Sequence, residues 1–252
     1  MSVVSLPMYD FAELRAPHDA FWAAVVAAHG PGVPDRLTHD VDDVHTLWHD
    51  PAMAVSQACG WPLIDELDGA VRLVGAFSYD VSTAAGPRYR SHLVARAGEA
   101  PEPATATAAV NSFASLSGWI SLVQAFPALG GRWTGDVVVT GAHVDSLAAL
   151  QSGTADVAAI DAVTHAIVER HRPHLLDGLV IVGHGPLIPC TPLIANTAAT
   201  DGDVARLQDA FAVAAEALEP ANPLLITGFH RLTIDDYADV RTLGSVWEGA
   251  RP

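Results

Sequence analysis

The sequence predicts an α/β fold in which mainly parallel sheets are flanked by helices. Short apolar runs typical of buried strands alternate along the chain with segments of helical periodicity, which is the order that parallel sheets require. The 252 residues suffice for one large α/β domain or for two lobes, each with its own core. Half of the residues are hydrophobic and 17% are charged, which excludes a mainly disordered chain.

The N-terminal part is predicted to open with a strand over 3–8 and a helix over 17–29. The helix prediction rests on four apolar residues at helical spacing: Phe21, Trp22, Val25 and Val26. Three weaker elements follow, namely a strand within 46–48, a helix over 52–58 and a turn at 60–62. Residues 71–77 then predict a clear strand.

The middle of the chain continues the alternation. A strand is predicted over 89–95, after the break at Gly86-Pro87, and a loop rich in Pro, Ala and Glu follows over 98–107. A short strand at 108–110 then leads into a helix over 119–126, whose start a serine can cap.

The second half follows the same order up to the C-terminus. The predicted strands are 136–140, 155–160 and 179–183, and the predicted helices are 146–151, 162–171, 201–218 and 234–246. Gly153 ends the first of these helices. The proline-rich residues 185–192 predict a crossover, and 226–228 stay ambiguous. The simplest partition has a first lobe made of 1–90 and 189–252 and a second lobe made of 91–188.

Charge and hydropathy exclude several kinds of partner. Thirteen basic and twenty-nine acidic residues give a net charge of −16, which repels nucleic acid and anionic lipid. No apolar run approaches the roughly 20 residues that cross a bilayer, so no membrane insertion is expected. The N-terminus lacks a basic region followed by a long apolar stretch. We therefore expect a cytoplasmic protein, or a periplasmic or cell-surface one if a leader has been trimmed.

Motifs for common cofactors are absent from the sequence. There is no GxGxxG after a strand, no P-loop and no GxSxG, so we predict no cofactor and no catalytic residue. Cys59 and Cys190 form no CxxC pair, which gives no sign of a zinc framework. Among the twelve histidines, the group that most suggests a metal site is His165, His171 and His174. Only His171 and His174 are spaced near one helical turn, so we predict no metal site.

Five segments together resemble one known family. They are Ser56-Gln57-Ala58-Cys59-Gly60-Trp61-Pro62, Tyr89-Arg90-Ser91, Ser115-Leu116-Ser117-Gly118, Gly141-Ala142-His143 and the run from Gly153 to Asp161. Their order is similar to that of the phosphate/phosphite/phosphonate-binding proteins of ABC transporters, a branch of the type 2 periplasmic-binding fold. The resemblance covers nearly the whole chain. It implies two lobes with a ligand cleft between them.

The resemblance assigns an oxyanion site to Ser115 and Ser117, where hydroxyls and backbone N–H groups meet at a helix start. The alternative role for both serines is simple N-capping. Leu116 departs from the family, which has a hydroxyl residue there, so one oxygen contact is expected to be lost. This departure makes a carboxylate, or a neutral ring with one polar edge, a better candidate than the family resemblance alone implies. His143 follows a strand and is expected to touch the ligand, or else to bind loop backbone.

The remaining predicted contacts also come from the resemblance. Asp161 stands at a strand end and is expected to bind an amino group, although it can equally cap the next helix. Tyr89 is expected to reach the ligand with its hydroxyl. Tyr9 and Trp48 are expected to add walls and Gln57 a polar contact, while aromatic residues are more often part of the core.

These features predict a solute-binding protein that holds a small polar or anionic ligand, phosphonate-like, phosphate-like or carboxylate, by closing two lobes over it. An ABC-transporter permease is an expected partner if the protein is exported. The alternative is a cytoplasmic enzyme of lyase or hydrolase type that uses the same cleft on a small acid. In that case Cys59, Ser115 or Ser117 could act as a nucleophile with His143 as base.

Overall fold

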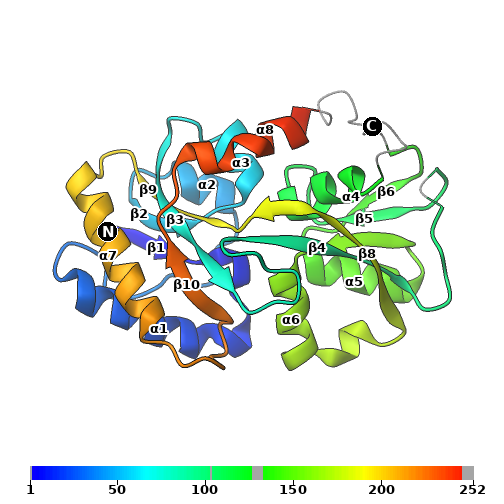
Figure 1. Ribbon diagram of the computed structural model, residues 1–252, viewed down its shortest axis with the longest axis horizontal. Coiled ribbons are helices and arrows are strands. Elements are labelled where there is room, and N and C mark those ends of the chain that lie inside the picture. Colours follow the sequence, from blue (N-terminus) through cyan, green and yellow to red (C-terminus); the bar gives the residue numbers. More distant parts are fainter. Residues whose placement is uncertain (1, 103, 127–132, 246–252) are drawn as a thin grey trace. The chain divides into compact units, whose positions relative to one another are not determined.

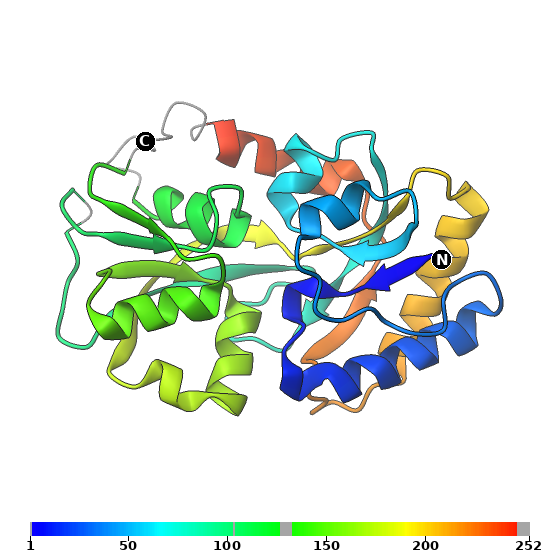
Figure 2. The same cartoon turned by 180° about the vertical axis from the view of Figure 1, so that it is seen from behind.

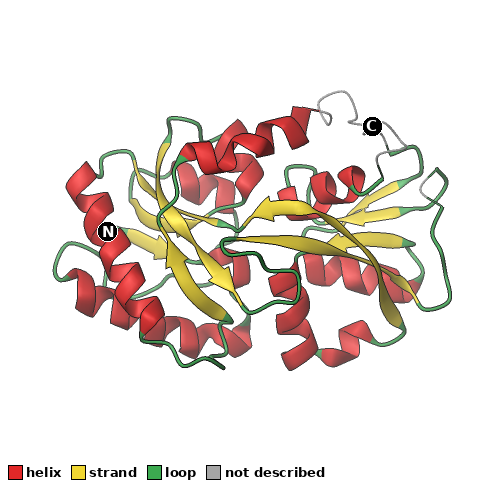
Figure 3. Cartoon of the chain, in the orientation of Figure 1, coloured by secondary structure: helices red, strands yellow, loops and turns green. Residues whose placement is uncertain are grey.

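Helices and strands alternate along the chain in the computed structural model, which describes residues 2–102, 104–126 and 133–245 (Figures 1 and 3). The chain divides into two units. The first contains the described residues of Met1–Asp80, Ala84–Pro87 and Pro189–Ala238, and the second contains those of Val81–Thr83, Arg88–Ile188 and the chain from Asp239 onward. The predicted partition placed all of 189–252 in the first lobe. The structure groups helix α8 (Ala238–Ser245) with the second unit from Asp239.

The first unit is built on a five-stranded sheet of mixed direction. Its strand order is β1 (Val3–Ser5), β2 (Met53–Gln57), β9 (Pro192–Asn196), β3 (Val71–Tyr79) and β10 (Ile226–His230). Only the β1–β2 pairing is parallel in this order, which differs from the mainly parallel sheet expected. The reason is connectivity: β9 enters the sheet without a preceding helix, and antiparallel neighbours need no helical crossover.

Two long helices cover one face of this sheet. Helices α1 (Arg15–His29) and α7 (Asp201–Glu216) lie side by side and α7 packs on β3 and β10 (Figure 1). The core beneath them is aromatic, since the ring of Phe77 lies 5.5 Å from that of Phe21 and 5.7 Å from that of Phe211. The shorter helical elements of the unit are η1 (Pro7–Tyr9), η2 (Ala12–Leu14), α2 (Val44–His49), α3 (Gly60–Asp65) and η6 (Ile234–Tyr237).

Three short predictions in this unit are wrong. The strand expected within 46–48 lies in helix α2, which Asp43 caps by accepting a 3.0 Å hydrogen bond from the His45 N–H. The helix expected over 52–58 is strand β2, because pairing with β1 and β9 overrides local propensity. The turn expected at 60–62 is the first turn of α3, where a proline is tolerated.

The second unit has its own five-stranded sheet. Its strand order is β6 (Val137–Val139), β5 (Ala108–Val110), β7 (Val157–Ile160), β4 (Arg88–Arg96) and β8 (Leu179–Pro189). Strand β5 is parallel to both β6 and β7, while β4 is antiparallel to β7. The chain passes from the second unit to the first at Ile188–Pro189, within the crossover predicted over 185–192, but most of this stretch is strand, because β8 extends to Pro189 and β9 begins at Pro192. The ambiguous residues 226–228 belong to strand β10.

Helices cover both faces of the second sheet. Helices α5 (His143–Ser152) and α6 (Ala162–His171) pack on one face, and α4 (Ser121–Gln124) lies on the other, as Figure 2 shows from behind. A π-helical turn, η3 (Leu116–Ile120), leads into α4, and η5 (Pro173–Leu176) follows α6. In the described part of the chain, no helix is both long and apolar enough to cross a membrane.

Candidate functional site

The parallel strands of the second unit bring polar residues to one edge of its sheet. Asn111 directly follows β5, Asp161 directly follows β7, and the turn after β6 leads to His143 at the start of α5. Carboxyl ends of parallel strands meet at the same edge, where open α/β sheets bind ligands. The backbone joins the first two loops, since the Gly141 N–H donates a 3.1 Å hydrogen bond to the Asn111 carbonyl.

The two predicted serines have different roles in the structure. Ser115 caps the turn η3, since its Oγ accepts a 2.9 Å hydrogen bond from the Gly118 N–H. Ser117 Oγ instead lies 3.0 Å from Nε2 of His143, within hydrogen-bond distance. Both serines are buried. The capping alternative thus describes Ser115, whereas Ser117 is paired with the predicted histidine.

His143 is held as a neutral ring. Burial lowers the pKa of its imidazole, and the nearby charge of Asp161 and the Ala159 backbone oppose this shift without cancelling it. Its buried Nδ1 has no well-formed hydrogen bond to the described residues, although the Ala159 backbone interacts with the ring and opposes the fall in pKa. One ring nitrogen therefore pairs with Ser117, and the other is held at most weakly by the backbone.

Asp161 is held by the protein on both of its oxygens. Oδ1 accepts hydrogen bonds of 2.9 Å from the N–H groups of Val163 and Thr164 at the start of α6, which is the capping role considered above. Oδ2 accepts a hydrogen bond from the Tyr89 hydroxyl. Both side chains are about 2% exposed. This pairing shows how Asp161 is positioned at the edge of the sheet.

The other three predicted contacts belong to the first unit and form a buried group there. The Gln57 Nε2 donates to the Tyr79 hydroxyl at 3.1 Å and to Thr191 Oγ1 at 2.8 Å. Trp48 Nε1 donates to the Gln57 carbonyl at 3.2 Å, and the ring of Tyr9 packs edge-on against Tyr79. Tyr9, Trp48 and Gln57 are each at most 5% exposed. The structure thus brings these three together around Tyr79.

Three further polar groups of the second unit were not predicted from the sequence. Ser91 Oγ, Asn111 Oδ1 and Trp119 Nε1 are buried and lack hydrogen-bond partners among the described residues. Among these three, only Asn111 could have been noticed in the sequence, because it directly follows the strand predicted over 108–110. The described residues contain no group of three His, Cys, Asp or Glu side chains suited to a metal ion. Cys59 is half-buried and Cys190 is buried.

Comparison with protein families gives one match that covers more than half of the chain. Residues 74–237 match the family model described as an ABC transporter, phosphonate, periplasmic substrate-binding protein. The chain belongs to this family. The predicted family resemblance and the two-lobed α/β fold class are confirmed, and the solute-binding prediction is supported over the enzyme alternative. No curated protein matches the chain by sequence.

Solved structures of other substrate-binding proteins share the fold. PhnD1 from Prochlorococcus marinus, in complex with methylphosphonate, has a TM-score of 0.76 at 12% identity over 98% of each chain. A binding-protein component of an ABC phosphonate transporter from Pseudomonas aeruginosa has a TM-score of 0.74 at 16% identity, over 96% of this chain and 84% of its own. MatC from Rhodopseudomonas palustris, with bound malate, has a TM-score of 0.60 at 15% identity, over 98% and 95%.

This family member departs from the expected serine loop at Leu116. The Leu116 side chain is only 2% exposed, so this position faces the interior, and its carbonyl accepts a 2.8 Å hydrogen bond from Ser121 Oγ. The loop therefore offers the hydroxyl of Ser117, which pairs with His143, since the hydroxyl of Ser115 is occupied by its cap.

Proposed function

We propose that the protein reversibly binds a small polar or anionic solute, phosphonate-like or carboxylate, at the carboxyl edge of β5, β6 and β7. The observation that carries the proposal is the 3.0 Å pairing of Ser117 Oγ with Nε2 of the buried, neutral His143 at this edge. Methylphosphonate and malate in the similar proteins are both oxyanions, which supports an oxyanion ligand here.

The electrostatics of the site favour a ligand of low charge. The residues that line it, as named above, include neither lysine nor arginine, and burial keeps His143 neutral. Neutral hydrogen-bond donors can hold a monoanion, but a buried dianion without a cation is costly. A carboxylate or a singly charged phosphonate therefore fits better than a fully ionised phosphate. The replacement of a family hydroxyl by Leu116 also disfavours a fully ionised phosphate, because the loop has one hydroxyl fewer to bind its oxygens.

A hydrolytic role fits the same residues less well. Ser117 and His143 are close enough for a nucleophile and its base. However, Nδ1 of His143 has no well-formed hydrogen bond to a carboxylate among the described residues, and the nearby Asp161 carboxylate is engaged by Tyr89 and the start of α6. A working triad needs a third group that fixes the base. Reversible binding needs only hydrogen bonds to the ligand and no such third group.

Family membership also suggests a partner and a place of action. We propose that the loaded protein delivers its solute to an ABC-transporter permease outside the cytoplasm. Closure of the two units over the solute stays a prediction, as do ligand contacts from Tyr9, Trp48 and Gln57.

Titration calorimetry with methylphosphonate, inorganic phosphate and malate tests the proposal. At least one should bind and be recovered unchanged, and Ser117→Ala or His143→Ala should weaken that binding by roughly tenfold, because each removes a hydrogen bond to a charged ligand. Ser152→Ala, an exposed serine of the second unit, is the matched control and should leave affinity unchanged. Chemical alteration of a bound compound would instead support the enzyme alternative. Equal affinity in all variants would show that the ligand does not bind at Ser117 and His143.

A further inference from the structure

The Asn111 side chain is a polar group without a structural role at the proposed site. Its carboxamide makes no hydrogen bond to the described part of the protein, and its Oδ1 is buried. Its backbone, by contrast, is fixed, because its carbonyl accepts from Gly141 and it directly follows β5. The side chain is therefore held in place by the strand end while its hydrogen-bonding groups stay unused.

Gly118 makes room for this carboxamide against the serine loop. A Cβ at position 118 would collide with Oδ1 of Asn111 and would come within 3.0 Å of Ser115 Oγ. Gly118 also donates its N–H to Ser115, so the loop and Asn111 share one packing arrangement. Since Ser117 precedes Gly118 directly, the unused amide lies beside the loop that offers the ligand its hydroxyl.

A buried acceptor without a partner lowers the stability of a folded protein, so native proteins seldom retain one without a reason. We propose that Asn111 is a ligand-binding residue, and that its amide oxygen selects a solute carrying an O–H or N–H donor next to its anionic group. This inference rests on the proposed function, and it narrows the solute class to hydroxy- or amino-substituted acids.

The chemistry of the amide explains the selectivity. A simple carboxylate presents only acceptor oxygens, which repel Oδ1, whereas a neighbouring hydroxyl or amino group can donate to it. A site built around a polar group discriminates strongly against a ligand that leaves that group unpaired. Ser117 and His143 thus bind the anionic group of the ligand, and Asn111 requires in addition that the ligand carry a hydrogen-bond donor.

Two matched ligand pairs test the inference: hydroxymethylphosphonate against methylphosphonate, and glycolate against acetate. The native protein should bind the hydroxylated member of at least one pair about fivefold more tightly, the value of one buried hydrogen bond. Asn111→Leu, similar in size but unable to form hydrogen bonds, should abolish that preference without lowering the thermal midpoint. Gly118→Ala should also reduce the preference, because the new methyl group displaces the amide.

The outcomes separate this inference from the proposed function. If no member of either pair binds the native protein, the role of Asn111 is overturned, and if inorganic phosphate and malate do not bind either, the proposed function fails as well. If the native protein binds both members of each pair equally, or Asn111→Leu keeps the preference, only the role of Asn111 is overturned. A marked loss of stability in Asn111→Leu would assign the residue a structural role and would also overturn it. Asn196→Leu, in the first unit, is the matched control and should keep the native preference.

Discussion

Replacing Asp161 with alanine is expected to lower the free energy of unfolding by about 3 kcal/mol. The substitution removes the cap of α6, which costs about 1 kcal/mol, and takes the charged acceptor away from the buried Tyr89 hydroxyl, which costs about 1.5–3 kcal/mol. Urea unfolding followed by circular dichroism measures the change. The loss should appear as a lower midpoint at an unchanged slope.

Matched variants divide this loss between its two causes. Asp161→Asn should cost about 1 kcal/mol, because asparagine caps a helix as well as aspartate does. Tyr89→Phe should also cost about 1 kcal/mol and should be less than additive with Asp161→Ala, since both remove the same hydrogen bond. The exposed Asp145 on α5 is the control, and Asp145→Ala should have little effect. If Asp161→Ala were as stable as the native protein, the described anchoring of the carboxylate would be wrong.

The sequence patterns predicted long elements well and short ones poorly. The helix expected over 17–29 lies within α1, because its apolar spacing matches the face that packs on the sheet. By contrast, Met53–Gln57 is rich in residues that also suit a helix, and it becomes a strand through pairing with Val3–Ser5 and Pro192–Asn196. Such partners lie too far along the chain for local propensity to reveal them.

The site was predictable where it depends on strand ends and unpredictable where it depends on pairing. His143 and Asp161 were placed correctly at the carboxyl edge because each follows a predicted strand. The bond between Tyr89 and Asp161 joins residues 72 positions apart, and no spacing rule indicates it. Asn111 was missed because a lone asparagine after a strand is common in loops. Only the three-dimensional structure shows that its amide oxygen is buried and unpaired.

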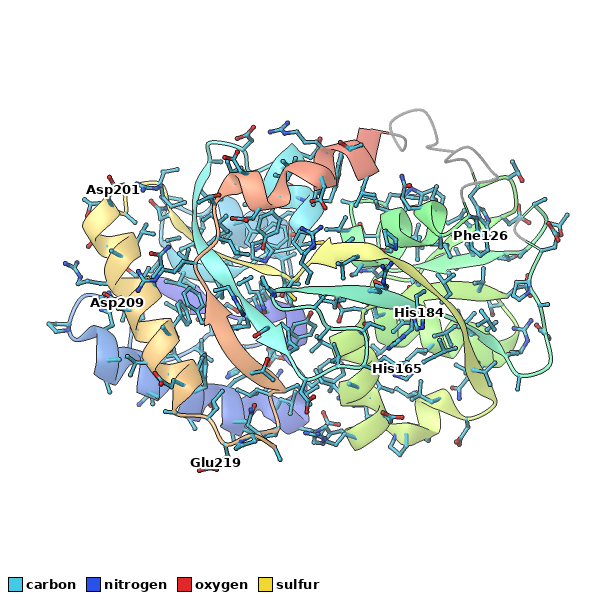
Figure 4. The ribbon with its side chains drawn as sticks, in the orientation of Figure 1. Phe126, His165, His184, Asp201, Asp209 and Glu219 are labelled. Atoms are coloured by element: carbon cyan, nitrogen blue, oxygen red, sulfur yellow. The ribbon has the colours of Figure 1, made fainter. Side chains whose placement is uncertain are left out.

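Acidification from about pH 7.5 to about pH 4.5 is expected to lower the free energy of unfolding by about 2–3 kcal/mol for each of two buried histidines. In the second unit, burial and, to a smaller extent, the neighbouring His165 and His184 together lower the pKa of His92 to about 4. Figure 4 shows His165 and His184, and Nδ1 of His184 lies 3.2 Å from Nδ1 of His92. In the first unit, burial likewise lowers the pKa of His18 to about 4.

The direction of the effect follows from proton binding. An unfolded histidine takes up its proton near pH 6.5, whereas His92 and His18 in the folded protein stay neutral down to about pH 4. Between these values only the unfolded state is protonated, so stability is full above about pH 6.5 and is lost as the pH falls towards 4. Asp10, whose pKa is lowered, contributes stability that is lost only below this window.

Urea unfolding across this pH range measures the effect, with one histidine replaced at a time. His92→Gln and His18→Gln should each reduce the acid-induced loss by about 2–3 kcal/mol, because each deletes one buried group that the unfolded state protonates. His143 and His165, whose pKa values burial also lowers, keep their own part of the loss. His174→Gln, at an exposed histidine, should keep the native pH dependence. Since His18 and His92 belong to different units, two resolved unfolding transitions should each respond to only one of the two substitutions. A free energy of unfolding that stayed constant from pH 7.5 to pH 4.5 would show that neither histidine is held neutral by burial.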